Sequence, residues 1–407
     1  MGNRFDVVVV GGGIVGLATA TSIRARRPEL AVAVLDKEPT VGSHQTGHNS
    51  GVVHSGVYYR PGSLKAELTL QGRRRMLDFA AAEKLPVGRI GKLIVATRAE
   101  EIPALDGILE RGRQNGVDRL RRIERSELEE RIPGLAGIGA LEVPSAAITD
   151  YGAIARRLAD QLTAGGAAVL VAHEVRGATD IDSGWRLATT AGDVEAGFVI
   201  NCGGLEADRI AEAMHVRPPV SIVPFRGDFY RLSPRARLAV PTLVYPIPDP
   251  SVPFLGVHLT PTVHGEVLAG PNAALALARE GYHPGQMQLE QLWRMAALPG
   301  LVGLVRNYGG LAAREWLKSW SPAQFLDAVR SLWPAATESD LGERTSGVRA
   351  QAVRADGTME DDFVLTRGPR ALHVLNAPSP AATAAFAIGD HVAREAGFGG
   401  VSPPTAG

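Results

Sequence analysis

A glycine-rich turn near the start of the chain has the residue types and the spacing that bind phosphate groups. Residues 11–16 read Gly-Gly-Gly-Ile-Val-Gly, which matches G-x-G-x-x-G, and they lie between an apolar run at 5–10 and a helical pattern at 17–27. In such a strand–turn–helix unit the three spaced glycines permit a tight turn, a close approach to a pyrophosphate, and close packing of the helix on the strand. The N–H groups at the helix start favour bound phosphate.

An acidic residue follows at the expected distance. Asp36 ends a second apolar run, 31–36, and lies 20 residues after Gly16, where a carboxylate can accept hydrogen bonds from ribose hydroxyls. The unit therefore predicts a dinucleotide, NAD or FAD. An NAD domain would continue in regular βα repeats, whereas residues 42–65 are polar and glycine-rich, and no second fingerprint follows a strand. These features favour FAD alone.

Four blocks carry a more specific resemblance. Residues 42–66 contain Gly-Ser-His-Gln-Thr-Gly-His-Asn-Ser-Gly-Val-Val-His-Ser-Gly-Val-Tyr-Tyr and then Pro-Gly-Ser-Leu-Lys-Ala; the other blocks are 254–260, 346–351 and 376–383. Together they resemble the L-2-hydroxyglutarate oxidase/dehydrogenase family, within the D-amino-acid oxidase-like flavoproteins. The blocks span nearly the whole chain, and 42–66 is the most specific of them.

The resemblance implies FAD-dependent oxidation of the 2-hydroxyl of L-2-hydroxyglutarate to 2-oxoglutarate, with electrons passed on to oxygen or a quinone. The reaction moves a hydride from C2 to flavin N5 while a base takes the hydroxyl proton, and histidine suits that base near neutral pH. His54 and His258 are the two candidates, one as the base and the other orienting the substrate. His44 and His48 are expected to order the loop or contact FAD.

A dicarboxylate substrate needs cations in its pocket. Arg349 occupies a place that resembles the substrate-carboxylate arginine of related amino-acid oxidases, and a guanidinium can bind a carboxylate with two hydrogen bonds; the alternative is a surface arginine. Lys65 is one of only five lysines, and it is expected either to bind the distal carboxylate or to tie the flavin loop to the next helix. Weaker candidates for the substrate pocket are Arg226, Tyr58, Tyr59 and Tyr245.

Further cofactor contacts are implied by the resemblance. Pro380 can begin a helix whose first N–H groups would stabilise negative charge on reduced flavin. Cys202 is expected to be a packed residue of the turn near the pyrophosphate, not a redox thiol. The expected cofactor-binding residues are Gly11, Gly13, Ile14, Val15, Gly16, Asp36, Lys37, Thr46, His48, Asn49, Ser50, Gly51, Val175, Cys202, Gly203, Gly204, Pro380, Ala381, Ala382 and Thr383.

Two kinds of domain must position these residues, and we expect an α/β fold (α+β overall). A Rossmann-like FAD-binding domain of the glutathione-reductase type, with an antiparallel meander formed by strands at 169–175, 185–190 and 198–201, is interrupted by an antiparallel-sheet substrate domain with helices. The predicted FAD-binding domain comprises 1–85, 145–215 and 340–407. The predicted substrate-binding domain comprises 86–144 and 216–339, with a helical segment at 284–333.

Composition limits the function classes. The chain has 43 Lys+Arg and 43 Asp+Glu in 407 residues, which argues against a nucleic-acid binder. One cysteine, Cys202, excludes an intramolecular disulfide or a cysteine-based metal site and indicates a reducing compartment. No apolar run is long enough to span a bilayer, so a cytoplasmic protein is expected, and no metal site.

Residues 292–333 stand apart, since they hold three more basic than acidic residues and four of the five tryptophans, Trp293, Trp316, Trp320 and Trp333. Such helices either lie on an anionic membrane, here the inner face of the cytoplasmic membrane, or pack on the second domain or another subunit. Two other functions stay open: a related flavoenzyme acting on another 2-hydroxy acid, a 2-amino acid or glycerol 3-phosphate, and a non-catalytic flavin redox sensor.

Overall fold

The first sheet is built around five parallel strands. The computed structural model describes residues 3–248 and 255–399, and in it the strand order β9–β2–β1–β12–β20 is parallel throughout. In β1, Val7 and Val9 face one core while Val8 and Val10 face another. Burial on both faces explains why this strand is continuously apolar in sequence. The bounds are β1 Arg4–Val10, β2 Val32–Leu35, β9 Ala168–Leu170, β12 Gly192–Asn201 and β20 Ala371–Asn376.

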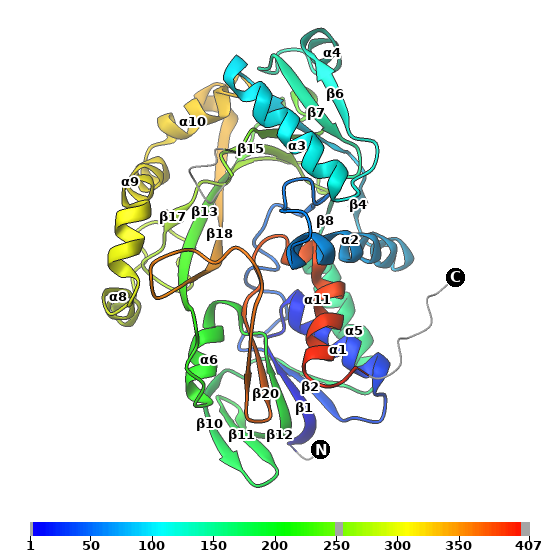
Figure 1. Ribbon diagram of the computed structural model, residues 1–407, viewed down its shortest axis with the longest axis vertical. Coiled ribbons are helices and arrows are strands. Elements are labelled where there is room, and N and C mark those ends of the chain that lie inside the picture. Colours follow the sequence, from blue (N-terminus) through cyan, green and yellow to red (C-terminus); the bar gives the residue numbers. More distant parts are fainter. Residues whose placement is uncertain (1–2, 249–254, 400–407) are drawn as a thin grey trace.

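Helices cover one face of this sheet. They are α1 (Ile14–Arg26), α5 (Tyr151–Ala164) and α11 (Ala381–Glu395), with α2 (Leu64–Ala82) packed against α11 (Figure 1). A Cβ atom at Gly389 would lie 2.6 Å from the Ala18 backbone. The absence of a side chain at Gly389 therefore allows α1 and α11 to pack backbone against backbone.

The other face carries a meander, β10 (Val175–Ile181), β11 (Gly184–Thr189) and the first half of β12, together with α6 (Ala207–Ala213). The predicted strand at 169–175 is wrong in its bounds. The chain turns at Ala172, which has a φ of +57°, so the run divides between β9 of the parallel sheet and the start of β10. At the edge of the sheet, β19 (Val364–Gly368) runs antiparallel to β20.

The second sheet has nine strands among the described residues, in the order β17–β13–β16–β15–β14–β5–β7–β6, with β18 on the free side of β13. Residues 341–353, expected in the FAD-binding domain, form β18 of this sheet and pair with β13 over nearly its whole length. The bounds are β5 Lys92–Ala96, β6 Arg121–Glu124, β7 Gly139–Val143, β13 Ser221–Leu232, β14 Leu243–Pro246, β15 His258–Pro261, β16 Val267–Gly270, β17 Ala274–Leu275 and β18 Leu341–Val353.

Helices flank the second sheet, with α8 to α10 following one another along its outer side beside β13 and β17, and α3 and α4 at its far end (Figure 1). A small third sheet joins β3 (Val52–Val53), β8 (Ala147–Thr149) and β4 (Val87–Gly88). Within the described residues, no helix combines the length and the apolar character needed to cross a bilayer. The remaining bounds are α3 Ile102–Gln114, α4 Arg125–Arg131, α7 Ala236–Ala239, α8 Leu289–Ala296, α9 Leu301–Trp320 and α10 Pro322–Arg330.

Candidate active site

The parallel strands end at a cavity of about 1170 Å³. The residues that line it include those directly after β1, β2, β12 and β20, namely Gly11, Asp36, Cys202 and Ala377. The cavity continues to the second sheet, where Arg349 also lines it. The carboxyl ends of parallel strands are where such folds bind their ligands.

The glycine turn has little room for side chains. A Cβ at Gly11, whose φ is +111°, would lie 2.3 Å from the Cys202 carbonyl oxygen, and one at Gly16 would lie 2.0 Å from the Gly11 carbonyl oxygen. At Gly13 a Cβ would contact only Thr46, at 3.4 Å. Gly13 lines the cavity, so its exposed backbone can approach a pyrophosphate there.

Asp36 is held in place by main-chain donors. Its Oδ2 accepts a hydrogen bond from the Gly12 N–H at 2.7 Å, and its Oδ1 accepts one from the Glu38 N–H at 2.8 Å. Burial raises the pKa of this carboxyl, while the two N–H groups oppose that shift. Each oxygen keeps a lone pair for a further donor, as ribose binding requires. Val175, Gly203 and Gly204 line the same cavity.

The loop at 42–51 is ordered by its own polar groups. The Asn49 amide donates to the carbonyls of Gln45 and Thr46, and its oxygen accepts from the Gly51 N–H at 2.8 Å. Gly51 itself is not among the residues that line the cavity; a Cβ there would lie 2.5 Å from the Thr149 carbonyl oxygen. Contrary to the expectation from sequence, Gly51 therefore shapes the loop and does not face the cavity.

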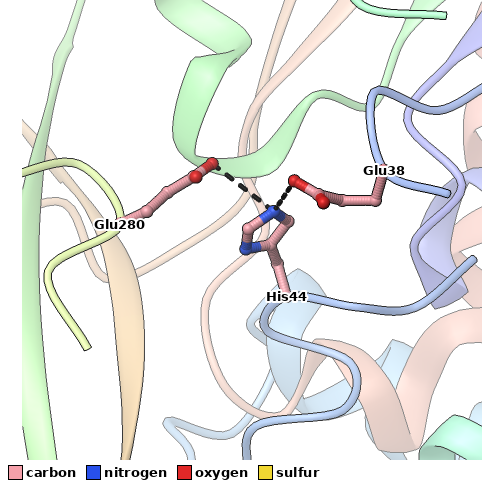
Figure 2. A group of neighbouring side chains, drawn as sticks. All are labelled: Glu38, His44 and Glu280. Atoms are coloured by element: carbon pink, nitrogen blue, oxygen red, sulfur yellow. Dashed lines mark hydrogen bonds and ion pairs between the residues drawn. The ribbon is translucent and has the colours of Figure 1, made fainter. Parts of the chain in front are cut away.

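His44 connects this loop to the second domain (Figure 2). Its Nε2 lies 2.7 Å from a Glu38 carboxylate oxygen and 3.5 Å from one of Glu280, and its Nδ1 lies 3.0 Å from the Tyr282 hydroxyl. The ligand atoms of Glu38, His44 and Glu280 lie within 4.8 Å of one another. The Lys37 ammonium already bonds both carboxylates, so this group is an ion-pair cluster in the structure.

His48 makes a second connection of the same kind. Its Nδ1 lies 3.1 Å from the Ser346 carbonyl oxygen, and its ring lies 4.5 Å from that of Tyr282. A Cβ at Gly347 would lie 2.2 Å from the His48 carbonyl oxygen. The backbone of β18 and the loop at 42–51 are therefore in direct contact.

The start of α11 fixes the main chain at His54. The His54 N–H donates to the Thr383 hydroxyl oxygen at 3.1 Å, and that hydroxyl lies 2.9 Å from the hydroxyl of Tyr151. Tyr151, which the sequence did not single out, also donates to the Val52 carbonyl oxygen. Residues 380–383 line the cavity, and the first N–H groups of a helix lack acceptors within it.

The opposite wall is one face of the second sheet. The antiparallel pairing of Val244 with Leu259 places Tyr245 of β14 opposite His258 of β15, and their ring centroids are 3.9 Å apart with a tilt of 31°. Burial lowers the pKa of His258 to about 3, with the positive charges of Lys92 and Arg349 acting in the same direction. Burial and the same two cations also hold the pKa of His54 well below its usual value. Both rings are therefore neutral at neutral pH.

Arg349 and Arg226 lie on opposite faces of the second sheet. In the antiparallel β13–β18 pair, Arg349 is the register partner of Phe225. Arg226 is the next residue along β13, and its register partner is Val348. Arg349 lines the cavity and Arg226 does not. Arg226 instead forms a buried ion pair with Asp228 at 2.9 Å. Strand alternation thus makes Arg226 a structural residue beneath the sheet, contrary to the expectation that it lines the pocket.

Lys65 lines the cavity but is already paired. Its ammonium lies 2.8 Å from an Asp361 carboxylate oxygen and 3.1 Å from the Asp361 carbonyl oxygen, and 5.2 Å from the centroid of the Tyr59 ring. It therefore ties the start of α2 to the segment before β19. Tyr58, Tyr59 and Tyr245 all line the cavity.

Cys202 and Lys92 complete the site. Burial raises the pKa of the Cys202 thiol to about 12, so the thiol stays protonated and is poorly suited to redox chemistry. Lys92, which sequence analysis did not assign, is 1% exposed and lies directly behind Tyr245. The available signal was a charged residue opening the otherwise apolar run Lys-Leu-Ile-Val-Ala at 92–96.

A family model described as "FAD dependent oxidoreductase" matches residues 6–395. The chain belongs to this family. Curated relatives include the L-2-hydroxyglutarate dehydrogenase of Indibacter alkaliphilus, 42% identical and covering 95% of this chain and 98% of the relative. The mitochondrial L-2-hydroxyglutarate dehydrogenase of Homo sapiens is 40% identical, covering 97% and 89%. The resemblance drawn from residues 42–66 is therefore confirmed.

Solved structures share the fold at lower identity. An FAD-bound L-alpha-glycerophosphate oxidase from Mycoplasma pneumoniae has a TM-score of 0.79 at 20% identity, covering 97% of this chain and 95% of that one. A glycine oxidase from Geobacillus kaustophilus has a TM-score of 0.72 at 20% identity, covering 96% and 95%. They confirm the mixed α/β architecture.

The chain is an FAD-dependent oxidoreductase, and the cavity fits that cofactor. One end has the open backbone at Gly13 and the half-buried carboxylate of Asp36, as a pyrophosphate and a ribose require. The start of α11 supplies N–H groups farther along the same cavity. These residues would hold FAD, with the second sheet as the wall opposite.

Proposed function

We propose that this flavoenzyme oxidises L-2-hydroxyglutarate to 2-oxoglutarate. The activity of its relatives, L-2-hydroxyglutarate dehydrogenases, supports the substrate. One feature of the cavity carries the proposal: its second-sheet wall presents Arg349, and Lys92 is buried behind Tyr245 of the same wall. The nearby carboxylate of Asp361 is paired with Lys65. The basic side chain of Arg349 at this wall suits an anionic substrate.

Three other carboxylates that line the cavity form ion pairs with basic residues other than Arg349 and Lys92. Glu280 bonds Lys37, while Glu206 and Glu290 bond Arg209. A dianion such as 2-hydroxyglutarate supplies the matching charge.

FAD, when bound, supplies the two-electron acceptor for the hydride from C2 of the substrate. Arg349 binds the carboxylate next to the reacting carbon with its planar guanidinium. His258 takes the hydroxyl proton, because its Nδ1 lies 3.0 Å from the Gly256 carbonyl oxygen and so carries the ring proton. Its Nε2 is then the unprotonated nitrogen of the neutral ring.

His54 orients the substrate in this proposal. Its main chain is fixed by Thr383, and its neutral ring lines the cavity. The carboxylates of a bound substrate would offset the charges of Lys92 and Arg349, which lower the pKa of both histidines. Substrate binding thus raises the basicity of His258 when a base is needed.

We further propose that α8 and α9 contact a membrane, from which a quinone would accept the electrons. Large apolar side chains are exposed together along this segment, including Trp293 at 76% and Val302 at 81%; the others are Met287, Leu289, Val305, Trp316 and Trp320. Tryptophan and aliphatic residues on adjoining amphipathic helices suit the bilayer interface.

Two of the residues in 292–333 contribute little to this surface. Trp333 is buried in the core, and the charge of Arg294 is paired with Glu212 and Glu290. The side chains of Arg314 and Lys318 lie outside the described part of the structure. The membrane proposal therefore rests on apolar burial more than on basic charge.

The reaction is tested by product analysis. Purified holoenzyme with a dye as electron acceptor should convert L-2-hydroxyglutarate to 2-oxoglutarate in proportion to dye reduced. Dye reduction with glycerol 3-phosphate or a 2-amino acid, and none with L-2-hydroxyglutarate, would reject the proposal.

A further inference from the structure

Several buried polar atoms at the second sheet have no hydrogen-bond partner within the described residues. Among them are the Lys92 ammonium and the Tyr58 hydroxyl. The ammonium lies 4.2 Å from the centroid of the Tyr245 ring and 5.1 Å from that of the Tyr58 ring. Ring faces stabilise a cation but accept no conventional hydrogen bond from it, so among the residues that the structure describes the Lys92 ammonium has no hydrogen-bonded counterion.

A buried unpaired cation is costly to a fold. The cost shows in the pKa of Lys92, which burial lowers to about 7. The sequence around Lys92 is apolar, and Leu93 and Ile94 on the same strand are buried in hydrophobic cores. A methionine at position 92 would satisfy the packing without a charge. The lysine therefore calls for an explanation outside folding.

The sheet order places Lys92 where an extended substrate would end. Arg349 lies on β18 and Lys92 on β5, and β15 with His258 lies between these strands in the sheet. If the hydroxyl carbon of a substrate lies at His258 and its first carboxylate binds Arg349, the rest of the substrate extends toward β14 and β5. Tyr58 and Tyr245, which line the cavity, separate Lys92 from this end of it.

From this arrangement we infer that Tyr58 and Lys92 recognise the distal carboxylate of the substrate. The Tyr58 hydroxyl donates to the carboxylate directly, and Lys92 acts from behind the tyrosine rings as a specificity-determining positioning residue. The inference rests on the proposed function and deepens it, because it names the groups that distinguish a dicarboxylate from a monocarboxylate. Lys65 does not take this part, since Asp361 already holds its ammonium.

The test compares two ligands that differ only at that end. In 2-oxopentanoate a methyl group replaces the distal carboxylate of 2-oxoglutarate, and binding of each to the oxidised holoenzyme is followed by the change in flavin absorbance. K92M should weaken 2-oxoglutarate binding by about tenfold or more and leave 2-oxopentanoate binding within about twofold, as loss of one charged contact predicts. Y58F should act in the same direction while keeping the ring.

Stability gives a second readout. K92M should raise the Tm of the ligand-free holoenzyme, because it removes an unpaired buried charge; a merely structural lysine would lower it. K84M is the matched control, since Lys84 is exposed and its loss should change neither readout. If K92M does not fold, the binding of 2-oxoglutarate and 2-oxopentanoate to Y58F still tests the inference.

Equal weakening of both ligands, or unchanged 2-oxoglutarate binding in K92M and Y58F, would overturn the inference. Failure of the proposed function looks different: wild-type enzyme would then show no preference for 2-oxoglutarate over 2-oxopentanoate, and L-2-hydroxyglutarate would not reduce its flavin.

Discussion

The Nδ1 atom of His258 lies 3.0 Å from the carbonyl oxygen of Gly256. A carbonyl oxygen only accepts, so the ring nitrogen must donate, and this fixes the neutral tautomer with the lone pair on Nε2. Tyr245 covers one face of the same ring. The imidazole is therefore set to receive a proton before any substrate binds.

Replacing this ring should slow the chemical step. We expect H258Q to lower the anaerobic rate of flavin reduction by about 10²–10⁴-fold, the usual contribution of a general base, with FAD content unchanged. The comparison variant H54Q should lose less than H258Q in that rate and more in substrate affinity. The reverse order of the two variants would make His54 the base.

The pH dependence of kcat/KM should follow the charges at the wall. In the free enzyme the pKa of His258 is about 3, so the base stays deprotonated and no acid limb appears between about pH 5 and 7. The pKa of Lys92 is about 7, so kcat/KM for L-2-hydroxyglutarate should fall as pH rises through that value and the ammonium is lost. The burial-lowered pKa of His54 keeps it from titrating there.

Here K92M is the control, because its profile should lack the alkaline limb. Its stability should differ too: folded Lys92 binds fewer protons than unfolded Lys92 between about pH 7 and 10.5, so wild type gains stability relative to K92M as pH rises through that window. An alkaline limb that persists in K92M would assign it to another group.

Asp36 should matter for cofactor binding. We expect D36A to raise the Kd for FAD by about 10- to 100-fold, because hydrogen bonds to a charged group contribute about 1.5–3 kcal/mol. Fluorescence titration of the apoprotein with FAD measures this Kd. D6A is the control, since Asp6 accepts a similar bond from the Ala31 N–H at 2.8 Å on the same sheet but is exposed and does not line the cavity. Equal effects of D36A and D6A on the Kd for FAD would contradict a role of Asp36 in FAD binding.

Lys65 should behave as a structural tie. Because Asp361 is exposed, the pair contributes at most about 1 kcal/mol to the free energy of unfolding. D361N should leave the ratio of L-2-hydroxyglutarate to L-2-hydroxypentanoate activity unchanged, and K65M should change both activities by the same factor. A selective loss of L-2-hydroxyglutarate activity in K65M would instead place Lys65 on the distal carboxylate.

The membrane proposal predicts a separable defect. The double variant W293S/V302S should release the holoenzyme from sedimenting phospholipid vesicles, while flavin reduction by substrate in solution stays intact. Substituting the exposed Leu238, which lies away from α8 and α9 in the sequence, by serine is the control. Unchanged vesicle binding of the double variant would refute the proposal.

Local sequence was sufficient where a feature depends on neighbours along the chain. The glycine turn and Asp36 were predictable because a single βα unit brings Gly11, Gly13 and the second strand together. The start of α11 was predictable to within one residue: the helix begins at Ala381, with Pro380 as its N-cap.

Nonlocal pairing explains the errors. Whether residues 341–353 belong to the first or second sheet depends on β13, more than 100 residues away. The prediction that Arg226 lines the pocket was wrong because side chains alternate between the two faces of a strand, and Arg226 points to the face away from the cavity. Lys92 was missed because its role emerges only when β5, β14 and the loop holding Tyr58 meet in space.

The most direct measurement is anaerobic mixing of the oxidised holoenzyme with L-2-hydroxyglutarate and, separately, with its D enantiomer, following flavin absorbance at about 450 nm. The L enantiomer should bleach the flavin rapidly and completely and give 2-oxoglutarate, with the D enantiomer inert. Reduction by the D enantiomer only, or by neither, would contradict the proposed function.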